Sequence, residues 1–204
     1  MPSTKRAPHK LNRKAQIVSA AERLLIQRGL ANVTTRAIAD AVPCSEGAIY
    51  VHFDNRLQLL LTVLEQALPE MLVPLHALEK KIGKGTPQGN LVVAMRGLQK
   101  FHERVPPMVG SLFAESDLLK GFRDSLATRG KGPQGGIARI TRYIRDEQKI
   151  GRVSEVVDAE AAAATMMSVS FFQAFTTALF GTTVPALRPA RIVASALQTG
   201  HSRK

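Results

Sequence analysis

Apolar residues recur along most of this chain at the spacing of one face of an α-helix. The first run places Ile17, Ala20, Ala21, Leu24 and Leu25 at i, i+3, i+4, i+7 and i+8. That spacing is typical of an amphipathic helix. Similar runs predict longer helices starting at Arg56 and at 89–104, 107–128, 134–149, 158–180 and 189–199. With two short helices between residues 34 and 53, the pattern predicts an all-α protein of about nine helices and no strand.

Breaks in the pattern divide the chain into three parts. Residues 1–11 carry two prolines and several charges without a helical period, which indicates a flexible basic arm. Residues 12–56 hold three short helices, and residues 57–204 form a larger helical bundle. Within the helix that begins at Arg56, Pro69 and Pro74 each remove a backbone donor, so we expect a kink or a break near Leu68.

The net charge of the chain indicates an anionic partner. The 204 residues include 28 basic and 16 acidic side chains, a net charge of +12. Such an excess favours nucleic acid or an anionic membrane surface as a partner, and it says nothing of the fold. Residues 1–14 carry five basic side chains and no acidic one, so basic density is higher at the N-terminus.

The remaining chemistry excludes several classes of protein. One cysteine, Cys44, allows neither an internal disulfide nor a cysteine-rich zinc site. We find no spaced nucleophile and base, no cluster of metal ligands and no glycine-rich phosphate loop, so we expect no enzyme, cofactor or metal. A signal peptide requires an apolar stretch after its basic start, and no such stretch follows the basic N-terminus here. We therefore expect a cytoplasmic protein.

The short helices around Val42–Cys44 have the layout of a helix-turn-helix unit. Thr34 or Thr35 can cap the first helix, and Ser45 can cap the second. Such a unit presents the N-terminal turn of its second helix to the major groove. Gly47 and Ala48 are small enough for a close approach to DNA, and Arg36 has the two-pronged donor geometry that recognises guanine.

The segment TTRAIADAVPCSEGAIYVHFDNRLQLLLTVLE, residues 34–65, resembles the TetR family of transcriptional regulators. The preceding amphipathic stretch, residues 15–30, agrees with this resemblance, whereas the chain after residue 56 carries little family signature. Two positions of the turn depart from the pattern, since Pro43 stands where glycine is usual and Cys44 where valine is usual. In addition, Arg56 replaces the usual lysine.

The resemblance implies a set of DNA contacts, in two groups. Contacts to the DNA backbone are implied for Thr34 or Thr35, Ser45, Tyr50, His52 and Arg56. Contacts to base edges are implied for Arg36, Glu46, Gly47 and Ala48. For Glu46 a second interpretation stays open, because an acid in the first turn of a helix also favours the helix dipole. Cys44 is interpreted as a structural thiol in the small core of the turn.

The resemblance also implies a homodimer and a small-molecule ligand. The helices at 158–180 and 189–199 are expected to pair two chains through a four-helix bundle, with Ile192, Val193, Ala196 and Leu197 as one apolar stripe. Some large apolar residues of the bundle are expected to line a ligand cavity. The candidates are Met95, Phe101, Met108, Phe113, Phe122, Met167 and Phe171.

The sequence therefore predicts a homodimeric repressor that binds a palindrome-like double-stranded DNA operator and is released by a small molecule. An alternative is a basic architectural DNA-binding protein without ligand control. An enzyme built on the C-terminal bundle is a third interpretation. A fourth is a membrane segment in the uncharged run 161–187. Because six residues of 161–180 are polar and five are alanine, we favour a buried or paired helix there and no membrane partner.

Overall fold

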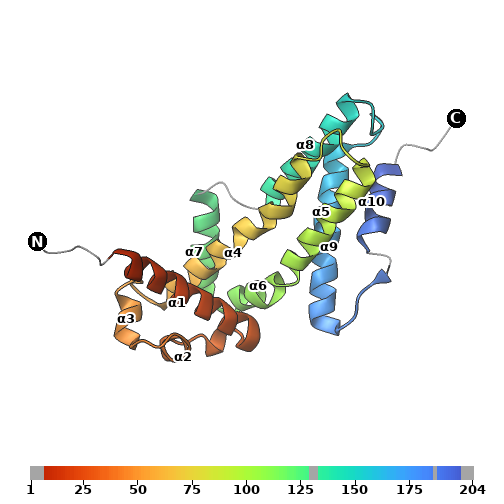
Figure 1. The fold of residues 1–204 in the computed structure, drawn as a ribbon. Coiled ribbons are helices and arrows are strands. Elements are labelled where there is room, and N and C mark those ends of the chain that lie inside the picture. Colours follow the sequence, from red (N-terminus) through yellow and green to blue (C-terminus); the bar gives the residue numbers. More distant parts are fainter. Residues whose placement is uncertain (1–6, 129–132, 186–187, 199–204) are drawn as a thin grey trace, which may run out of the picture. The chain divides into compact units, whose positions relative to one another are not determined.

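The computed structural model describes residues 7–128, 133–185 and 188–198 of the chain. Within these ranges, the side chains of 7–12, 31, 67–69, 107–109, 111, 128, 133 and 198 lie outside the description. The described part holds ten α-helices and one 3₁₀ turn and no strand, which confirms the all-α prediction (Figure 1).

The chain forms two compact units. The first contains residues 1–67 and 107–125, and the second contains residues 68–106 and 126–204. We predicted a division at residue 56. The compact unit instead extends along the next helix and takes up a distant segment, because Leu59, Leu60, Leu112 and Leu118 share one buried core with the N-terminal helices.

In the first unit, α1 (Ala7–Arg28) lies across α2 (Thr35–Ala41) and α3 (Glu46–Tyr50), and the 3₁₀ turn η1 (Leu30–Asn32) joins α1 to α2 (Figure 1). The apolar face foreseen for α1 is the one that is buried: Ile17, Ala20 and Ala21 are inaccessible to solvent. The beginning of α4 (Arg56–Glu79), α6 (Val105–Ala114) and α7 (Ser116–Thr128) complete the same unit.

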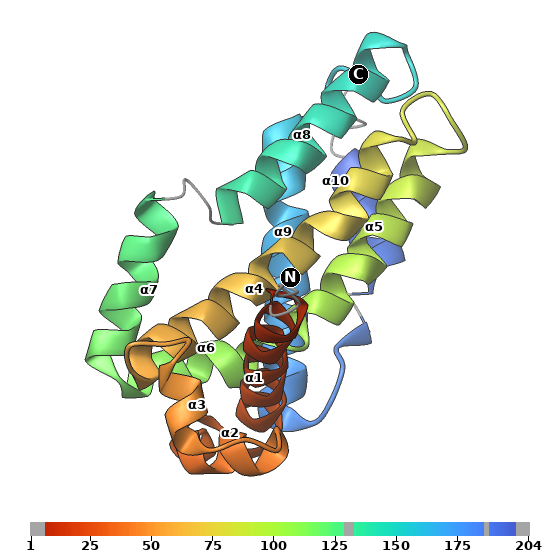
Figure 2. The same ribbon diagram turned by 60° about the vertical axis from the view of Figure 1, so that its left-hand side comes forward.

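In the second unit, α8 (Pro133–Lys149) packs along α9 (Ala159–Phe180) (Figure 2). Helices α5 (Pro87–His102) and α10 (Pro189–Gln198) both contact α9 and each other. Their core is made of Leu, Ala, Ile and Met side chains, with Tyr143 as its largest fully buried member.

Three local expectations need correction. Helix α1 begins at Ala7, inside the predicted flexible arm, because Pro8 occupies the first turn, where a helix needs no N–H from it. Residues 1–6 of that arm lie outside the described residues. The single helix predicted over 107–128 is two helices, which meet at Glu115.

The third correction concerns α4, which continues unbroken through Pro69 and Pro74. A proline in a helix interior costs about 3 kcal/mol. Beyond Pro74, however, Leu75 and Leu78 are buried in the core of the second unit. Burying one leucine side chain stabilises by about 2 kcal/mol, so the burial of these two offsets most of the roughly 6 kcal/mol that two interior prolines cost.

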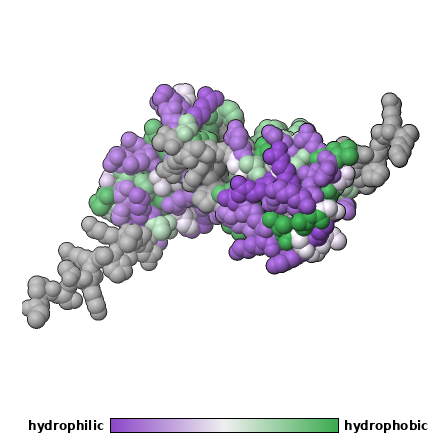
Figure 3. Space-filling model, turned by 90° about the horizontal axis from the view of Figure 1, so that it is seen from above, coloured by the Kyte–Doolittle hydropathy of each residue, from purple (hydrophilic) through white to green (hydrophobic). Residues whose placement is uncertain are grey.

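One face of the molecule is mostly hydrophilic, with smaller separate hydrophobic patches (Figure 3). Among the described helices, only α9 is long and apolar enough to cross a membrane by length and composition. A helix in the core of a bundle has the same properties, and α9 buries Ala163, Met166 and Ser170 within the second unit.

Candidate nucleic-acid interface

Both short helices of the first unit begin with a side-chain cap. The Thr34 hydroxyl accepts a hydrogen bond from the Ala37 amide at 3.1 Å, and the Ser45 hydroxyl accepts one from the Ala48 amide at 3.3 Å. Of the two threonines that the sequence offered, Thr34 is therefore the cap, and Thr35 is the first residue of α2. These caps set where α2 and α3 begin.

Pro43 lies in the turn between α2 and α3 and directly follows Val42. Val42 has an extended backbone, with φ of −124°, and its side chain is buried. The Pro43 carbonyl accepts a bond from Arg13 Nη1 at 3.4 Å. The side chain of Cys44 is half-buried against the same core, which agrees with a structural thiol.

The outer surface of α2 and α3 carries most of the predicted contact residues. Arg36 is exposed and makes no polar contact within the described part of the chain, and Tyr50 is 51% exposed. Gly47 is open, because a Cβ added there would meet only the Ser45 hydroxyl, at 3.9 Å. Ala48 and His52 are half-buried on the same short segment.

Glu46 has a partner inside the unit. One of its carboxylate oxygens accepts a hydrogen bond from the Thr35 hydroxyl at 2.6 Å. This bond ties the first residue of α3 to the first residue of α2. It also reduces the capacity of both side chains for contacts with another molecule.

Arg56 differs from the rest of the predicted set. Its guanidinium donates to the backbone carbonyls of Leu30 and Val33 at 3.0 Å each, and to both carboxylate oxygens of Glu115 at 3.2 Å. A fifth bond joins Nη2 to Glu115 at 3.4 Å, so the predicted role in contacting a phosphate must compete with five intramolecular bonds. Nothing in the local sequence indicated Glu115 as a partner, since it lies 59 residues away.

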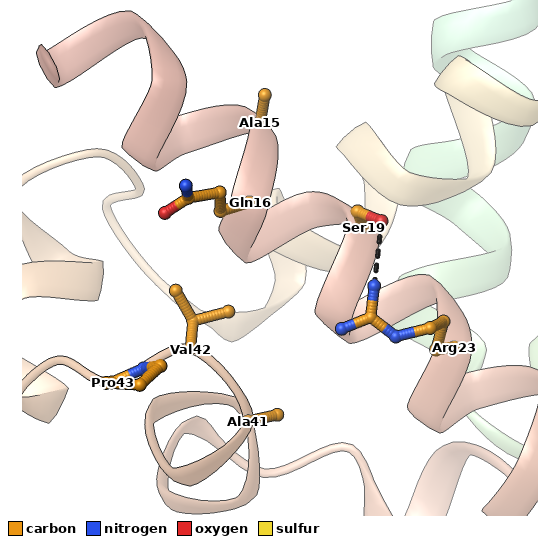
Figure 4. Close-up of a pocket in the computed structure, with 7 residues that line it drawn as sticks. All are labelled: Ala15, Gln16, Ser19, Arg23, Ala41, Val42 and Pro43. Carbon is orange, nitrogen blue, oxygen red and sulfur yellow. Dashed lines mark hydrogen bonds between the residues drawn. The ribbon is translucent and has the colours of Figure 1, made fainter.

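Further basic groups stand on α1. Lys14 lies over the ring of Phe53, with its Nζ 5.2 Å from the ring centroid. A shallow groove of about 450 Å³ separates α1 from the end of α2, and its wall includes Gln16, Ser19 and Arg23 (Figure 4). Arg23 donates to the Ser19 hydroxyl at 3.0 Å (Figure 4).

The predicted ligand residues are divided between the two units. In the second unit, Met95 and Met167 are buried, Phe101 is half-buried and Phe171 is 39% exposed. In the first unit, Phe122 packs against the core, whereas Phe113 is 72% exposed and buries little. The side chain of Met108 lies outside the described residues.

Neither described groove involves these ligand candidates. The groove of about 450 Å³ lies in the first unit, and a second, of about 300 Å³, lies beside the start of α5. Within the described ranges, no three His, Cys, Asp or Glu side chains are grouped so that they could hold a metal ion.

His102, the last residue of α5, is buried within the second unit and does not lie on a solvated helix face. Its side chain is 4% exposed, and its Nδ1 lies 2.9 Å from the Ser170 hydroxyl on α9. The ring of Phe171 stands edge-on to it, with 5.8 Å between centroids. Burial lowers the pKa of His102 to about 4, so the imidazole is neutral near pH 7.

The two capped short helices, their shared core with α1 and the exposed outer surface of α2 and α3 define a helix-turn-helix protein. Residues 17–63 match the sequence profile of the family described as bacterial regulatory proteins, tetR family. This match confirms the resemblance that the sequence shows over the helix-turn-helix segment, and the chain is similar to further transcriptional regulators.

The chain is similar to some proteins in sequence over a short segment, and to others in fold over nearly its whole length. The HTH-type transcriptional regulator TtgR of Pseudomonas putida is 42% identical over 52 residues, which is 26% of this chain and 25% of TtgR. The match thus spans about a quarter of that relative's length. A TetR-family regulator from Mesorhizobium loti has 16% identity but a TM-score of 0.75, covering 95% of this chain and 98% of that one.

A second solved structure is the regulator FadR from Bacillus subtilis in complex with stearoyl-CoA. It is 14% identical, has a TM-score of 0.64, and covers 92% of this chain and 99% of FadR. At these identities the structural likeness shows the fold alone. The sequence likeness is concentrated in the helix-turn-helix unit.

Proposed function

We propose that this protein is a repressor of transcription that binds a palindrome-like DNA operator as a homodimer and is released by a small-molecule ligand. The single observation that carries the proposal is the helix-turn-helix unit. Its two helices are capped by side chains, and its outer surface leaves Arg36, Gly47 and Tyr50 accessible.

The DNA contacts follow from this surface. Arg36 makes no polar contact with the described residues, so its donors can reach a guanine edge, and Gly47 lets the backbone of α3 approach a base closely. Tyr50 and His52 offer donors to phosphates at the end of α3. Thr34 and Ser45 hold the helix starts through their caps, and Thr35 and Glu46 hold each other. We retain these four, together with Ala48, as secondary contact candidates.

An exposed stripe on α9 supports the homodimer. Residues at alternating steps of four and three lie on the solvent side of this helix: Ala161, Thr165, Ser168, Phe172, Phe175 and Leu179. That spacing is the seam pattern of paired helices. A monomer would leave Phe172 and Leu179 more than half exposed, at 55% and 60%. A two-fold pairing of this stripe would bury both.

The apolar stripe of α10, formed by Ile192, Val193, Ala196 and Leu197, supports the dimer less than the sequence suggested. Val193 and Ala196 are buried, and Ile192 and Leu197 pack against the core of their own unit. Intramolecular packing with α5 and α9 therefore explains this stripe. We assign the dimer contact chiefly to α9.

We assign the ligand to the second unit, because it holds four of the seven candidate residues. Its candidate lining residues are Met95, Phe101, Met167 and Phe171, and methionine side chains adapt easily to different apolar shapes. FadR, which shares the fold, was solved with stearoyl-CoA, a molecule with a long apolar chain. For release, the ligand must bind the form with low DNA affinity more tightly than the DNA-bound form.

The test is selection from a pool of random duplexes, followed by binding to the selected duplex and to a scrambled one at two salt concentrations. We expect a preference that survives the higher salt, since salt weakens mainly the phosphate contacts that all sequences share. Arg36→Ala should reduce the preference by about 1–3 kcal/mol, the value of one two-pronged base contact.

Arg28→Ala is the matched control, because Arg28 is also an exposed arginine of the first unit. It should lower the affinity for both duplexes alike. Equal binding to both duplexes by the wild type, collapsing together as salt rises, would support the alternative of an architectural protein without sequence preference.

A further inference from the structure

Three segments that are distant in the sequence meet at the guanidinium of Arg56. The side chain itself begins α4. Its Nε donates to Val33, its Nη2 donates to Leu30, and its Nη1 donates to both oxygens of Glu115. The segment Leu30–Val33, the start of α4 and the junction of α6 with α7 are thus joined by one side chain.

The bonds of Arg56 use the fork of donors that only arginine offers. The two carbonyls belong to the segment Leu30–Val33, which connects α1 to α2, and the Leu30 carbonyl also accepts a bond from the Val33 amide at 3.0 Å. A guanidinium can donate in several fixed directions in one plane, whereas a lysine ammonium acts as a point charge. The side chains of Arg56 and Glu115 are 36% and 39% exposed, so solvent only partly screens the pair.

Glu115 is held in place by a rigid corner. It is the one residue between α6 and α7, and its amide donates to the Leu112 carbonyl at 3.3 Å. Leu112 and Leu118, on either side of it, are buried in the core that also contains Leu59 and Leu60. Helix α7 lies so close to α4 that a Cβ added to Gly121 would be 3.0 Å from Leu61 Cδ1.

We propose that Glu115 is a positioning residue for DNA recognition. Through Arg56 it holds the start of α4, and with it the end of α3, at a fixed distance from the connection between α1 and α2. Arg56 then acts as a brace and not as a phosphate contact. The position of the corner between α6 and α7 consequently controls how well the helix-turn-helix unit fits DNA, which deepens the proposed function and rests on it.

The sign of one mutational effect separates this proposal from simple electrostatics. Glu115→Ala removes a negative charge, which by charge alone strengthens binding to DNA. Loss of the brace predicts the opposite, a DNA affinity weaker by about tenfold, the scale of one lost charge-assisted hydrogen bond. Asp117→Ala is the control, because it removes an exposed negative charge two residues away from the same corner.

The salt dependence of binding separates a brace from a phosphate contact. Each lost phosphate contact lowers the slope of log K against log salt by about 0.9. We expect Arg56→Gln to weaken binding to the selected duplex and leave that slope unchanged. The proposal is overturned if Arg56→Gln lowers the slope by about 0.9 while Glu115→Ala binds DNA as tightly as the wild type. Arg56 would then be a phosphate contact.

Hydrogen exchange of the free protein gives a readout that needs no DNA. Amides of residues 30–50 should exchange several-fold faster in Glu115→Ala than in Asp117→Ala, while helix content stays that of the wild type. Equal exchange in the two variants overturns the brace, even where the wild type binds its selected duplex. If Glu115→Ala exchanges faster but the wild type shows no sequence preference for DNA, the structural role of Arg56 and Glu115 is supported and the proposed function is rejected.

Discussion

Single residues of this protein act through the surroundings that the fold gives them. His102 illustrates this, because its sequence context, FHERVP, looks like a solvated helix end. In the structure it is buried next to Ser170 and between the rings of Phe101 and Phe171. Desolvation disfavours the charged imidazolium, and this lowers its pKa.

A pH dependence of stability follows from His102. Its pKa is about 4 in the folded state, against an ordinary value of 6.5, so between these values the unfolded chain binds more protons. Stability contributed by the neutral form is present above pH 6.5 and is lost as the pH falls toward 4. From pH 7 to pH 5 this loss is about 2 kcal/mol.

Urea unfolding of wild type and His102→Gln at pH 7 and pH 5 measures the effect. Between pH 7 and pH 5, the free energy of unfolding of the wild type should fall by about 2 kcal/mol more than that of the variant. His76→Gln serves as the control, since His76 is exposed on α4. An equal pH dependence of the wild type and His102→Gln would contradict the assignment of the shift to His102.

At the scale of elements, helix boundaries respond to packing as well as to local sequence. Helix α4 continues through two prolines because residues beyond them are buried. Conversely, the segment 105–128 breaks at Glu115 without a proline or a glycine at the break. The periodicity correctly located the helical segments, but it could not show where one helix ends and the next begins.

The close approach of α4 and α5 gives a prediction on Gly97. A Cβ added there would lie 2.6 Å from the Cβ of Pro74, which is closer than two such atoms come in proteins. Gly97→Ala should therefore destabilise the protein by about 1–3 kcal/mol, although alanine is the better helix former.

Gly135→Ala provides the comparison within the same unit. Gly135 lies in α8, and a Cβ added there would meet nothing within 4 Å. This variant should gain up to about 1 kcal/mol from helix propensity. Thermal unfolding of both variants measures the difference, and a stabilised Gly97→Ala would show that the two helices separate at little cost.

At the scale of the whole molecule, the chain folds as two units whose members alternate along the sequence. Residues 107–125 join the N-terminal unit, whereas 68–106 and 126–204 form the other. Segments far apart in the chain therefore build one core, which the order of the helices along the chain does not show. The apolar residues of α9 divide likewise between the core of their unit and an exposed stripe.

The exposed stripe of α9 predicts the effect of charge on assembly. Phe172→Lys with Leu179→Lys places two like charges on the proposed seam, where each would face its partner chain. We expect a monomer by analytical ultracentrifugation, with unchanged helix content, and a loss of binding to a two-half-site duplex. Val93→Lys is the control, because Val93 is 67% exposed on α5. A dimer that survives the double substitution would place the interface elsewhere.

The sequence by itself determined the features that depend on neighbours in the chain. Caps at Thr34 and Ser45, the periodic face of α1 and the turn at Val42–Cys44 are local, because their hydrogen bonds and spacing span a few residues. These features were sufficient for the all-α fold, the helix-turn-helix unit and the resemblance to the TetR family.

Only the tertiary structure decided the burial of His102, the burial of the α10 stripe within its own unit and the hydrogen bonds between Arg56 and Glu115. Each depends on which distant residues meet once the helices pack. The physical reason is that burial and long-range pairing are properties of the assembled core, and a one-dimensional pattern contains only the apolar faces available to form it.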